Sequence, residues 1–263
     1  MKQITVVALY GAKSSDFAAL ITRCQGLVQS LLDVGFRPYD PYQIHATIFG
    51  LERKIPSALY NANFSRYRGR DLVMNLEGIL DYLRRCSHFP LQIQIGGFGK
   101  RDYPFVSRRA GPYQRSFSIQ GNKVVMMGWP IRGKPFSLPP GTPSALVGEA
   151  KFYPLTLNVI RHAAQAHGVL HAYHRELTDV DNDLFFRIGL LSDQTSLSEQ
   201  ARATLETEAR RFLSIQPPLI LEIHLEQVSV AVYEEDTLPR SSTRLWSLGD
   251  PDLTVSALME HLG

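Results

Sequence analysis

The stretch His45-Ala46-Thr47-Ile48-Phe49-Gly50-Leu51 lies in a run, 42–51, that predicts a β-strand. Successive side chains of a strand alternate between its two faces, so we expect His45, Thr47 and Phe49 to share one face. An imidazole can move a proton near neutral pH, and a hydroxyl can hold a phosphate oxygen. The pattern therefore predicts a strand that carries protons and binds phosphate. The alternative is a histidine at a strand edge, hydrogen-bonded to a neighbouring loop.

Helical and strand patterns alternate along the chain on both sides of this stretch. A β-branched run predicts a buried strand over 4–10, and an amphipathic pattern that Gly35 closes predicts a helix over 17–34. Further helices are expected over 71–85, 153–166 and 196–212, loops over 53–70 and 133–148, and further strands over 91–98, 115–119, 123–129, 183–191, 219–234 and 244–248. Hairpins with helices packed outside them predict an α+β fold with mainly antiparallel sheets.

Composition is that of an ordinary soluble globular protein. The 263 residues are 44% hydrophobic and 20% charged, and a net charge of +3 predicts no strong field for a polyanion. We find no signal-peptide pattern and no apolar run of membrane-spanning length, so we expect a cytoplasmic protein that binds no membrane. Cys24 and Cys86 fit no metal or redox spacing and are expected to be buried thiols in a reducing compartment.

The strand 45–50, which follows one strand and one helix, resembles the first signature of the two-histidine (2H) phosphoesterase superfamily. That group includes the bacterial RNA 2′,3′-cyclic phosphodiesterases, also called 2′-5′ RNA ligases. The stretch 91–98 is similar to the strand after the second helix in those proteins, and 228–239 to their last long strand. The resemblance implies one bilobal domain over 1–263, in which two mainly antiparallel sheets face a central groove with helices packed outside.

The resemblance also implies a chemistry. Such proteins act on a cyclic phosphate or an RNA 2′,3′-cyclic end without metal or cofactor. One histidine serves as base and the other as acid, and hydroxyls hold the phosphate oxygens. His45 and Thr47 match the first H-x-[ST] motif residue by residue.

The second motif is replaced in this chain by Arg187-Ile188-Gly189. Arginine cannot exchange a proton near neutral pH, but its planar fork can hold a phosphate. We therefore expect Arg187 to bind the phosphate of the substrate. The alternative is an ion pair that orients Arg187 with Asp181 or Asp183, which have the same strand parity.

His171 and His174, just upstream, are the candidates for a second proton carrier. The alternative is a solvated or locally hydrogen-bonded loop. A metal site built from both histidines and an aspartate is a further alternative, although we expect no metal. A calcium loop is excluded, because Leu184 and Leu190 stand where such a loop needs glycine and glutamate.

A basic and aromatic run over 100–109 continues to Tyr113 and Arg115. Arginines interleaved with aromatic rings can clamp phosphates and stack bases. We expect Tyr113, Arg115 and Phe49 to contact the substrate together with Arg187. The alternative for the run is a long solvated hairpin loop.

Three functions remain open on the sequence. The first is a metal-independent phosphodiesterase. The second is a binder of a nucleotide or phosphate-bearing RNA end that kept the groove and lost the second histidine. The third is a protein-interaction domain that uses an exposed aromatic loop over 101–113. A second imidazole facing His45 across the groove would favour the enzyme.

Overall fold

The structure is a computed structural model that describes residues 2–32, 35–51, 53–55, 58–103, 105–132, 153–192 and 197–262. The whole of the expected loop at 133–148 lies outside these residues. The strands are β1 (Gln3–Ala8), β2 (Phe36–Pro38), β3 (Ala46–Gly50), β4 (Arg53–Ile55), β5 (Ala58–Asn61), β6 (Leu91–Ile95), β7 (Phe117–Gln120), β8 (Lys123–Arg132), β9 (Leu184–Leu191), β10 (Leu219–Ile223), β11 (Val228–Tyr233) and β12 (Arg244–Ser247).

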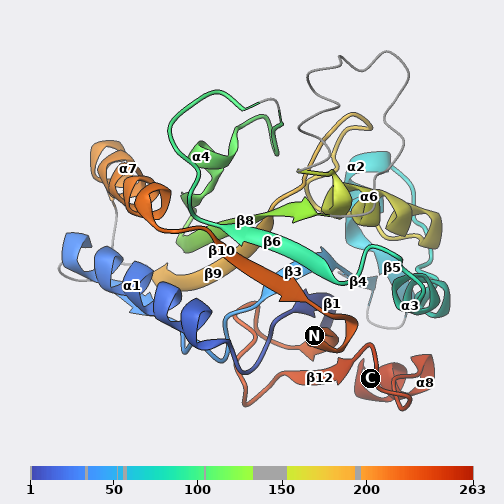
Figure 1. Cartoon of the computed structure of the whole chain (residues 1–263). Helices are drawn as coiled ribbons and strands as arrows, with labels where there is room; N and C mark the ends of the chain where they lie inside the picture. Colours follow the sequence, from blue (N-terminus) through green and yellow to red (C-terminus); the bar gives the residue numbers. More distant parts are fainter. Residues whose placement is uncertain are drawn as a thin grey trace.

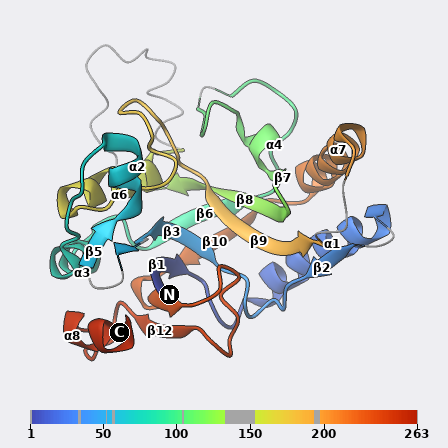
Figure 2. The same cartoon turned by 180° about the vertical axis from the view of Figure 1, so that it is seen from behind.

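The helices gather around this sheet material (Figures 1 and 2). They are α1 (Ser15–Leu32), α2 (Ala62–Arg68), α3 (Leu76–Arg84), α4 (Pro112–Arg115), α6 (Thr156–Ala163), α7 (Glu199–Ile215) and α8 (Val255–Leu262), with short 3₁₀ turns η1 (Ala164–His167) and η2 (Leu225–Gln227). Among the described helices, none combines the length and the apolar character needed to cross a membrane.

Ten of the described strands form one antiparallel sheet, with the order β10-β6-β8-β9-β3-β1-β11-β12 and with β2 and β7 pairing alongside. The α+β class with antiparallel strands is therefore confirmed. The expected two sheets are joined into one, because β3 and β9 pair at the centre through Ala46 and Phe186. Strands β4 and β5 form a separate hairpin.

The two halves of the large sheet repeat the same pairing on either side of this centre. Strand β1 pairs with β3 as β8 pairs with β9, and both pairs slip by one residue at the same place. The slip lies between Thr47 and Phe49 in one half and between Arg187 and Gly189 in the other. The pairings thus give the halves an approximate two-fold relation, in which position 45 is equivalent to 185 and position 47 to 187.

Several boundaries differ from the expected ones for local reasons. The helix expected from 71 begins at Leu76, because the Asn75 side chain accepts the backbone N–H of Gly78 and caps it. The segment 53–70, expected as a loop, contains β4, β5 and α2, and Asn61 caps α2 through two backbone N–H groups. Helix α7 is capped by Ser198.

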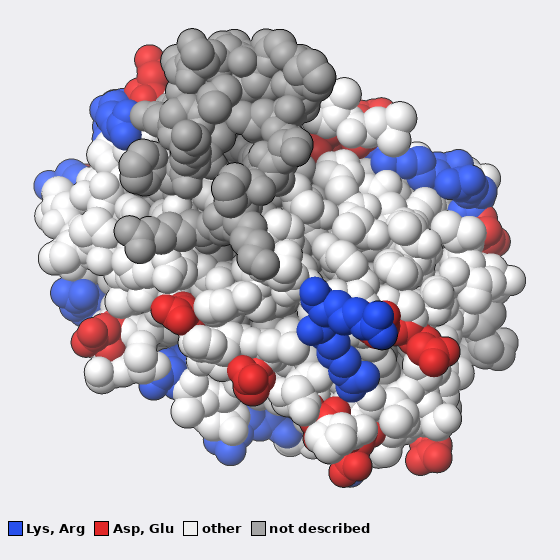
Figure 3. Space-filling view, turned by 45° about the vertical axis from the view of Figure 1, so that its right-hand side comes forward, with Lys and Arg blue, Asp and Glu red and all other residues white. Residues whose placement is uncertain are grey.

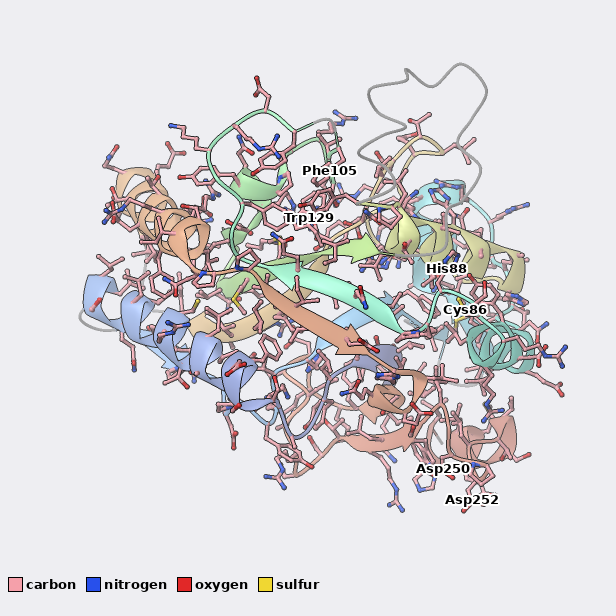
Figure 4. The ribbon with its side chains drawn as sticks, in the orientation of Figure 1. Cys86, His88, Phe105, Trp129, Asp250 and Asp252 are labelled. Carbon is pink, nitrogen blue, oxygen red and sulfur yellow. The ribbon has the colours of Figure 1, made fainter. Side chains whose placement is uncertain are left out.

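One hydrophobic core joins a face of the sheet to residues of α1, α3, α6, α7 and α8. Helices α1 and α7 run side by side at one end of the sheet, and α2, α3 and α6 lie at the other (Figure 1). Cys24 is buried in this core, as expected, whereas Cys86, near the end of α3, is only half-buried (Figure 4). Helices on this face leave the other face of β1, β3 and β9 open to form a cavity.

The aromatic loop before α4 turns inward. Phe105 and Trp129 lie against each other above the sheet, with ring centroids 5.4 Å apart (Figure 4). Phe98 completes this buried cluster, against which Tyr103 and Tyr153 pack. The rings therefore build structure at this place, which weakens the case for an exposed aromatic interaction loop. On the face shown in Figure 3, positive and negative side chains are interspersed, in keeping with the small net charge.

Candidate functional site

A cavity of about 220 Å³ opens where the two halves of the sheet meet. His45 and Thr47 from β3 and its approach line it together with Arg187 from β9. The full lining is Thr5, His45, Thr47, Gly50, Lys123, Phe185, Arg187, Tyr233, Asp236 and Leu238. The structure thus brings His45, Thr47 and Arg187 together, as the sequence predicts.

Phe49 does not belong to this cavity, which corrects the expectation from strand alternation. Val7 pairs with Thr47 but Val6 pairs with Phe49, so Ile48 is an extra residue in β3, a β-bulge. A bulge reverses the faces of the residues that follow it. Phe49 therefore points into the core with no exposed surface, and Gly50 takes its place in the cavity lining.

The residue that corresponds to His45 in the other half is Phe185. The pairing of Ala46 with Phe186 sets Phe185 and Arg187 against Thr47 and His45. The expected alignment of 187–189 with the second motif is therefore shifted by two residues, and Arg187 corresponds to Thr47 in the two-fold relation. Gly189 lies beyond the second bulge, where a Cβ would stand 2.4 Å from the ring of Phe36.

His45 is held as a neutral imidazole. Its Nδ1 lies 2.8 Å from the carbonyl oxygen of Gln43 and donates to it, which leaves Nε2 as the nitrogen that can accept a proton. The pKa of His45 is lowered from 6.5 to about 4, chiefly by burial. The Gln43 hydrogen bond raises the pKa, and the positive charges of Arg187 and Lys13 lower it. At neutral pH the ring therefore carries no charge.

Arg187 is oriented by Asp236, which corrects the expected pairing with Asp181 or Asp183. Arg187 Nη1 donates to the Asp236 carbonyl oxygen at 2.9 Å and lies 3.5 Å from its Oδ2. Lys123 Nζ lies 3.2 Å from the same Oδ2. One exposed carboxylate thus sits between the two cations of the cavity.

Asp181 and Asp183 serve other arginines. Asp183 accepts two hydrogen bonds from Arg115, at 2.8 and 3.0 Å. Arg115 is therefore a buried structural residue and not the expected substrate contact. Asp181 lies 2.9 Å from Arg161 and 2.8 Å from His171 Nε2. The Arg161 guanidinium then lowers the pKa of Asp181, against the opposing effect of burial.

His171 and His174 are not among the residues that line the His45 cavity. Both are buried, and His174 Nε2 lies 3.0 Å from Asn158 Oδ1 while its ring stacks on His162. Burial lowers the pKa of His171, and it lowers that of His174 to about 3. All eight histidines belong to the described part of the chain, and of these only His45 lines the cavity. Within that part, no group of three or more His, Cys, Asp or Glu side chains is arranged to hold a metal ion.

Tyr113 lies in α4, and its carbonyl oxygen accepts from the Ser116 hydroxyl at 2.8 Å. It does not line the cavity either. In its place the cavity has residues that sequence reasoning did not select, namely Thr5, Lys123, Phe185, Tyr233 and Asp236. Only Phe185 had a usable signal, since it lies on the expected strand 183–191, two residues before the proposed second motif.

The comparisons with known proteins find distant structural likeness only. No family model and no curated protein matches the chain. A conserved protein of unknown function from Agrobacterium tumefaciens, ATU0111, is 13% identical with a TM-score of 0.40, over 89% of this chain and 81% of its own. TT0787 of Thermus thermophilus is 9% identical with a TM-score of 0.36, over 94% of both chains. At these values the likeness carries no argument about family or activity.

Proposed function

We propose that this chain binds a nucleotide or RNA end through its phosphate in the His45 cavity and does not cleave it. The observation that carries the proposal is Phe185, which stands where the two-fold relation of the sheet would place a second histidine. Acid–base cleavage needs one group to take a proton and another to give one. The polar groups beside His45, namely Arg187, Lys123 and Thr47, are donors suited to phosphate oxygens.

The charge of the cavity supports a singly charged phosphate. Arg187 and Lys123 supply two positive charges, Asp236 one negative charge, and neutral His45 none, so the formal sum is +1. A phosphodiester, such as a 2′,3′-cyclic phosphate, carries one negative charge and balances this sum. A terminal phosphate monoester carries nearly two at neutral pH. We therefore expect the cyclic or internal diester to bind better than the monoester.

Titration calorimetry with a 2′,3′-cyclic nucleotide, run beside an assay for its hydrolysis, tests the proposal. The parent protein is expected to bind without turnover. Arg187→Ala is expected to weaken binding about tenfold or more, because a charged hydrogen bond is lost. Glu235→Gln, a change next to Asp236 outside the cavity lining, is the matched control. Equal binding by the parent and Arg187→Ala would contradict the proposal.

A metal-independent phosphodiesterase is the second candidate, and the state of His45 favours it. A neutral imidazole with a free Nε2 can take a proton from an attacking water molecule at pH 7. If the parent hydrolyses the cyclic nucleotide in excess chelator, His45→Ala is expected to slow turnover by about 10²–10⁴-fold with affinity changed only a few-fold. That result would replace the binding proposal with the enzymatic one.

A further inference from the structure

A second cavity, of about 600 Å³, lies between the loop before α4 and the loop before β9. Three arginines line it, Arg108, Arg109 and Arg175, beside the ring of Tyr173. These residues are separate from the lining of the His45 cavity. The basic and aromatic run of the sequence thus reaches a cavity through Arg108 and Arg109, and not through the buried Arg115.

Arg108 and Arg109 form the tip of a two-residue hairpin in an unfavourable conformation. Ser107 and Ala110 exchange both backbone hydrogen bonds, at 3.0 and 3.1 Å. The two arginines between them have φ of 51° and 65°. Such turns favour Asn-Gly or Gly-Gly, because a Cβ is strained at positive φ. Backbone strain of this kind concentrates at functional sites, so two adjacent arginines here indicate a use for their side chains.

The turn and one guanidinium are fixed in place. The Arg108 guanidinium carbon lies 3.6 Å from the centroid of the Tyr173 ring. The Arg108 backbone N–H donates to the Val180 carbonyl oxygen, and the Asn182 backbone N–H donates to Ser107 Oγ, each at 2.8 Å. A guanidinium stacked on a ring keeps its in-plane donors directed to the side, where an anion can meet them. The turn and the Arg108 side chain are already ordered before a ligand binds, which reduces the entropy cost of binding.

Two acids share the cavity, Glu176 and Asp179, so three arginines leave a formal charge of +1. Asp179 is engaged locally, since its Oδ2 accepts the Glu176 backbone N–H at 2.8 Å. We propose that this cavity is a phosphate-binding site in which Arg108, Arg109 and Arg175 donate to phosphate oxygens. Planar arginine forks match phosphate geometry, whether the phosphate belongs to a free polyphosphate or to a single-stranded RNA.

The turn itself supplies the test. The double variant Arg108→Asn/Arg109→Gly removes both guanidinium groups and installs the residues that the turn favours, so it is expected to fold at least as well as the parent. The probes are inorganic triphosphate and, separately, an RNA hexanucleotide without terminal phosphates, both followed by calorimetry. Affinity is expected to fall about tenfold or more in the variant for the probe that the site accepts.

The matched control is Arg211→Gln/Arg244→Gln, which removes two exposed arginines from α7 and β12. Loss of triphosphate binding alone assigns the site to a free polyphosphate, and loss of RNA binding assigns it to a nucleic-acid backbone. The RNA probe contains the internal diesters that the His45 cavity is proposed to bind, so both probes are also titrated against Arg187→Ala. A further loss of affinity when Arg108→Asn/Arg109→Gly is added to that variant is assigned to the second cavity. The proposal is overturned if neither probe binds the parent, if the turn variant binds like the parent, or if the control weakens binding equally.

Discussion

Asp236 is the residue that most directly sets the affinity of the His45 cavity for a phosphate ligand. Its Oδ2 lies 3.2 Å from Lys123 Nζ and 3.5 Å from Arg187 Nη1, which is where a ligand phosphate would also be attracted. The carboxylate therefore competes with any bound anion. Because its side chain is 65% exposed, water and salt reduce this competition.

Asp236→Asn is expected to raise affinity for a phosphate ligand by up to about fivefold, since surface charge pairs are worth up to about 1 kcal/mol. The gain should be larger for a phosphate monoester than for a cyclic diester, because the formal charge of the cavity rises from +1 to +2. Calorimetry with a nucleoside 3′-phosphate and a 2′,3′-cyclic nucleotide measures both. Glu235→Gln is the control, and an unchanged preference in Asp236→Asn would show that Asp236 does not select ligands.

At the same scale, the sequence predicted His45, Thr47 and Arg187 because their chemistry is visible in the residue types. The partners were not visible. Asp236 lies far along the chain from Arg187, and strand parity gave a nearer but wrong acid. The expectation for Phe49 was wrong because one extra residue in β3 reverses the faces of the residues that follow it. No residue type in 45–51 indicates a bulge. Long-range pairing decides such points, and a single sequence does not contain it.

At the scale of elements, the β3 bulge depends on helix α6. Arg161 is buried, and its Nε donates to the Ile48 carbonyl oxygen at 2.7 Å while Nη2 donates to that of Thr47 at 3.2 Å. Its Nη1 lies 2.9 Å from the Asp181 carboxylate. One side chain thus donates hydrogen bonds to the carbonyl oxygens at the bulge and pairs with a buried carboxylate.

Arg161→Met is expected to destabilise the protein by about 3–5 kcal/mol, because it leaves the Asp181 charge buried without its positively charged partner. The double variant Arg161→Met/Asp181→Leu should recover part of the loss, since a pair of apolar groups can replace a buried ion pair. Urea unfolding measures both. A loss below about 1 kcal/mol for the single variant, the size of a surface pair, would show that the pair is not desolvated as described.

At the Arg108-Arg109 hairpin, in contrast to Arg161, we expect a substitution to increase the stability of the protein. Each arginine there adopts positive φ, which costs a residue with a Cβ about 1–2 kcal/mol, more than the roughly 0.5–1 kcal/mol of extra chain entropy that a glycine loses on folding. Arg109→Gly alone is therefore expected to raise the midpoint of urea unfolding without changing its slope. Gly121, already glycine at a turn with φ of 63°, offers the reverse control, because Gly121→Arg should lower the midpoint. If Arg109→Gly is destabilising, the arginine side chain stabilises the fold more than its backbone conformation costs.

At the scale of the whole molecule, the expected α+β class and most strands were predictable from hydrophobic periodicity. The single continuous sheet was not, because its two halves join through Ala46 and Phe186, which are distant in sequence. That junction also creates the cavity. The two-fold relation between the halves lies in the pairing of strands and has no trace in the residue types, since His45 corresponds to Phe185 and Thr47 to Arg187.

The same architecture buries His171 and His174, partly buries His45, and keeps all three as neutral imidazoles, which predicts acid sensitivity. Burial lowers the pKa of all three, to about 4 for His45 and about 3 for His174. The pKa of a histidine in the unfolded chain is about 6.5. Between these values the unfolded chain binds more protons than the folded one. The free energy of unfolding should therefore be highest above about pH 6.5 and decrease as the pH falls toward about 4.

His45 and His174 should each contribute on the order of 2 kcal/mol to this loss between pH 7 and pH 5, and His171 contributes in the same direction. Asp181, whose pKa is also lowered, adds to it only as the pH falls below about 4, where an unfolded aspartate takes up its proton. Urea unfolding at pH 7, 6 and 5 gives the slope of the unfolding free energy against pH. His174→Asn is expected to reduce that slope, because it removes one buried imidazole whose pKa is lowered. The slope is compared, and not the absolute stability, because His174→Asn also alters packing. Equal slopes in the parent and His174→Asn would mean that His174 titrates alike in the folded and unfolded chain, and that its burial does not keep it neutral.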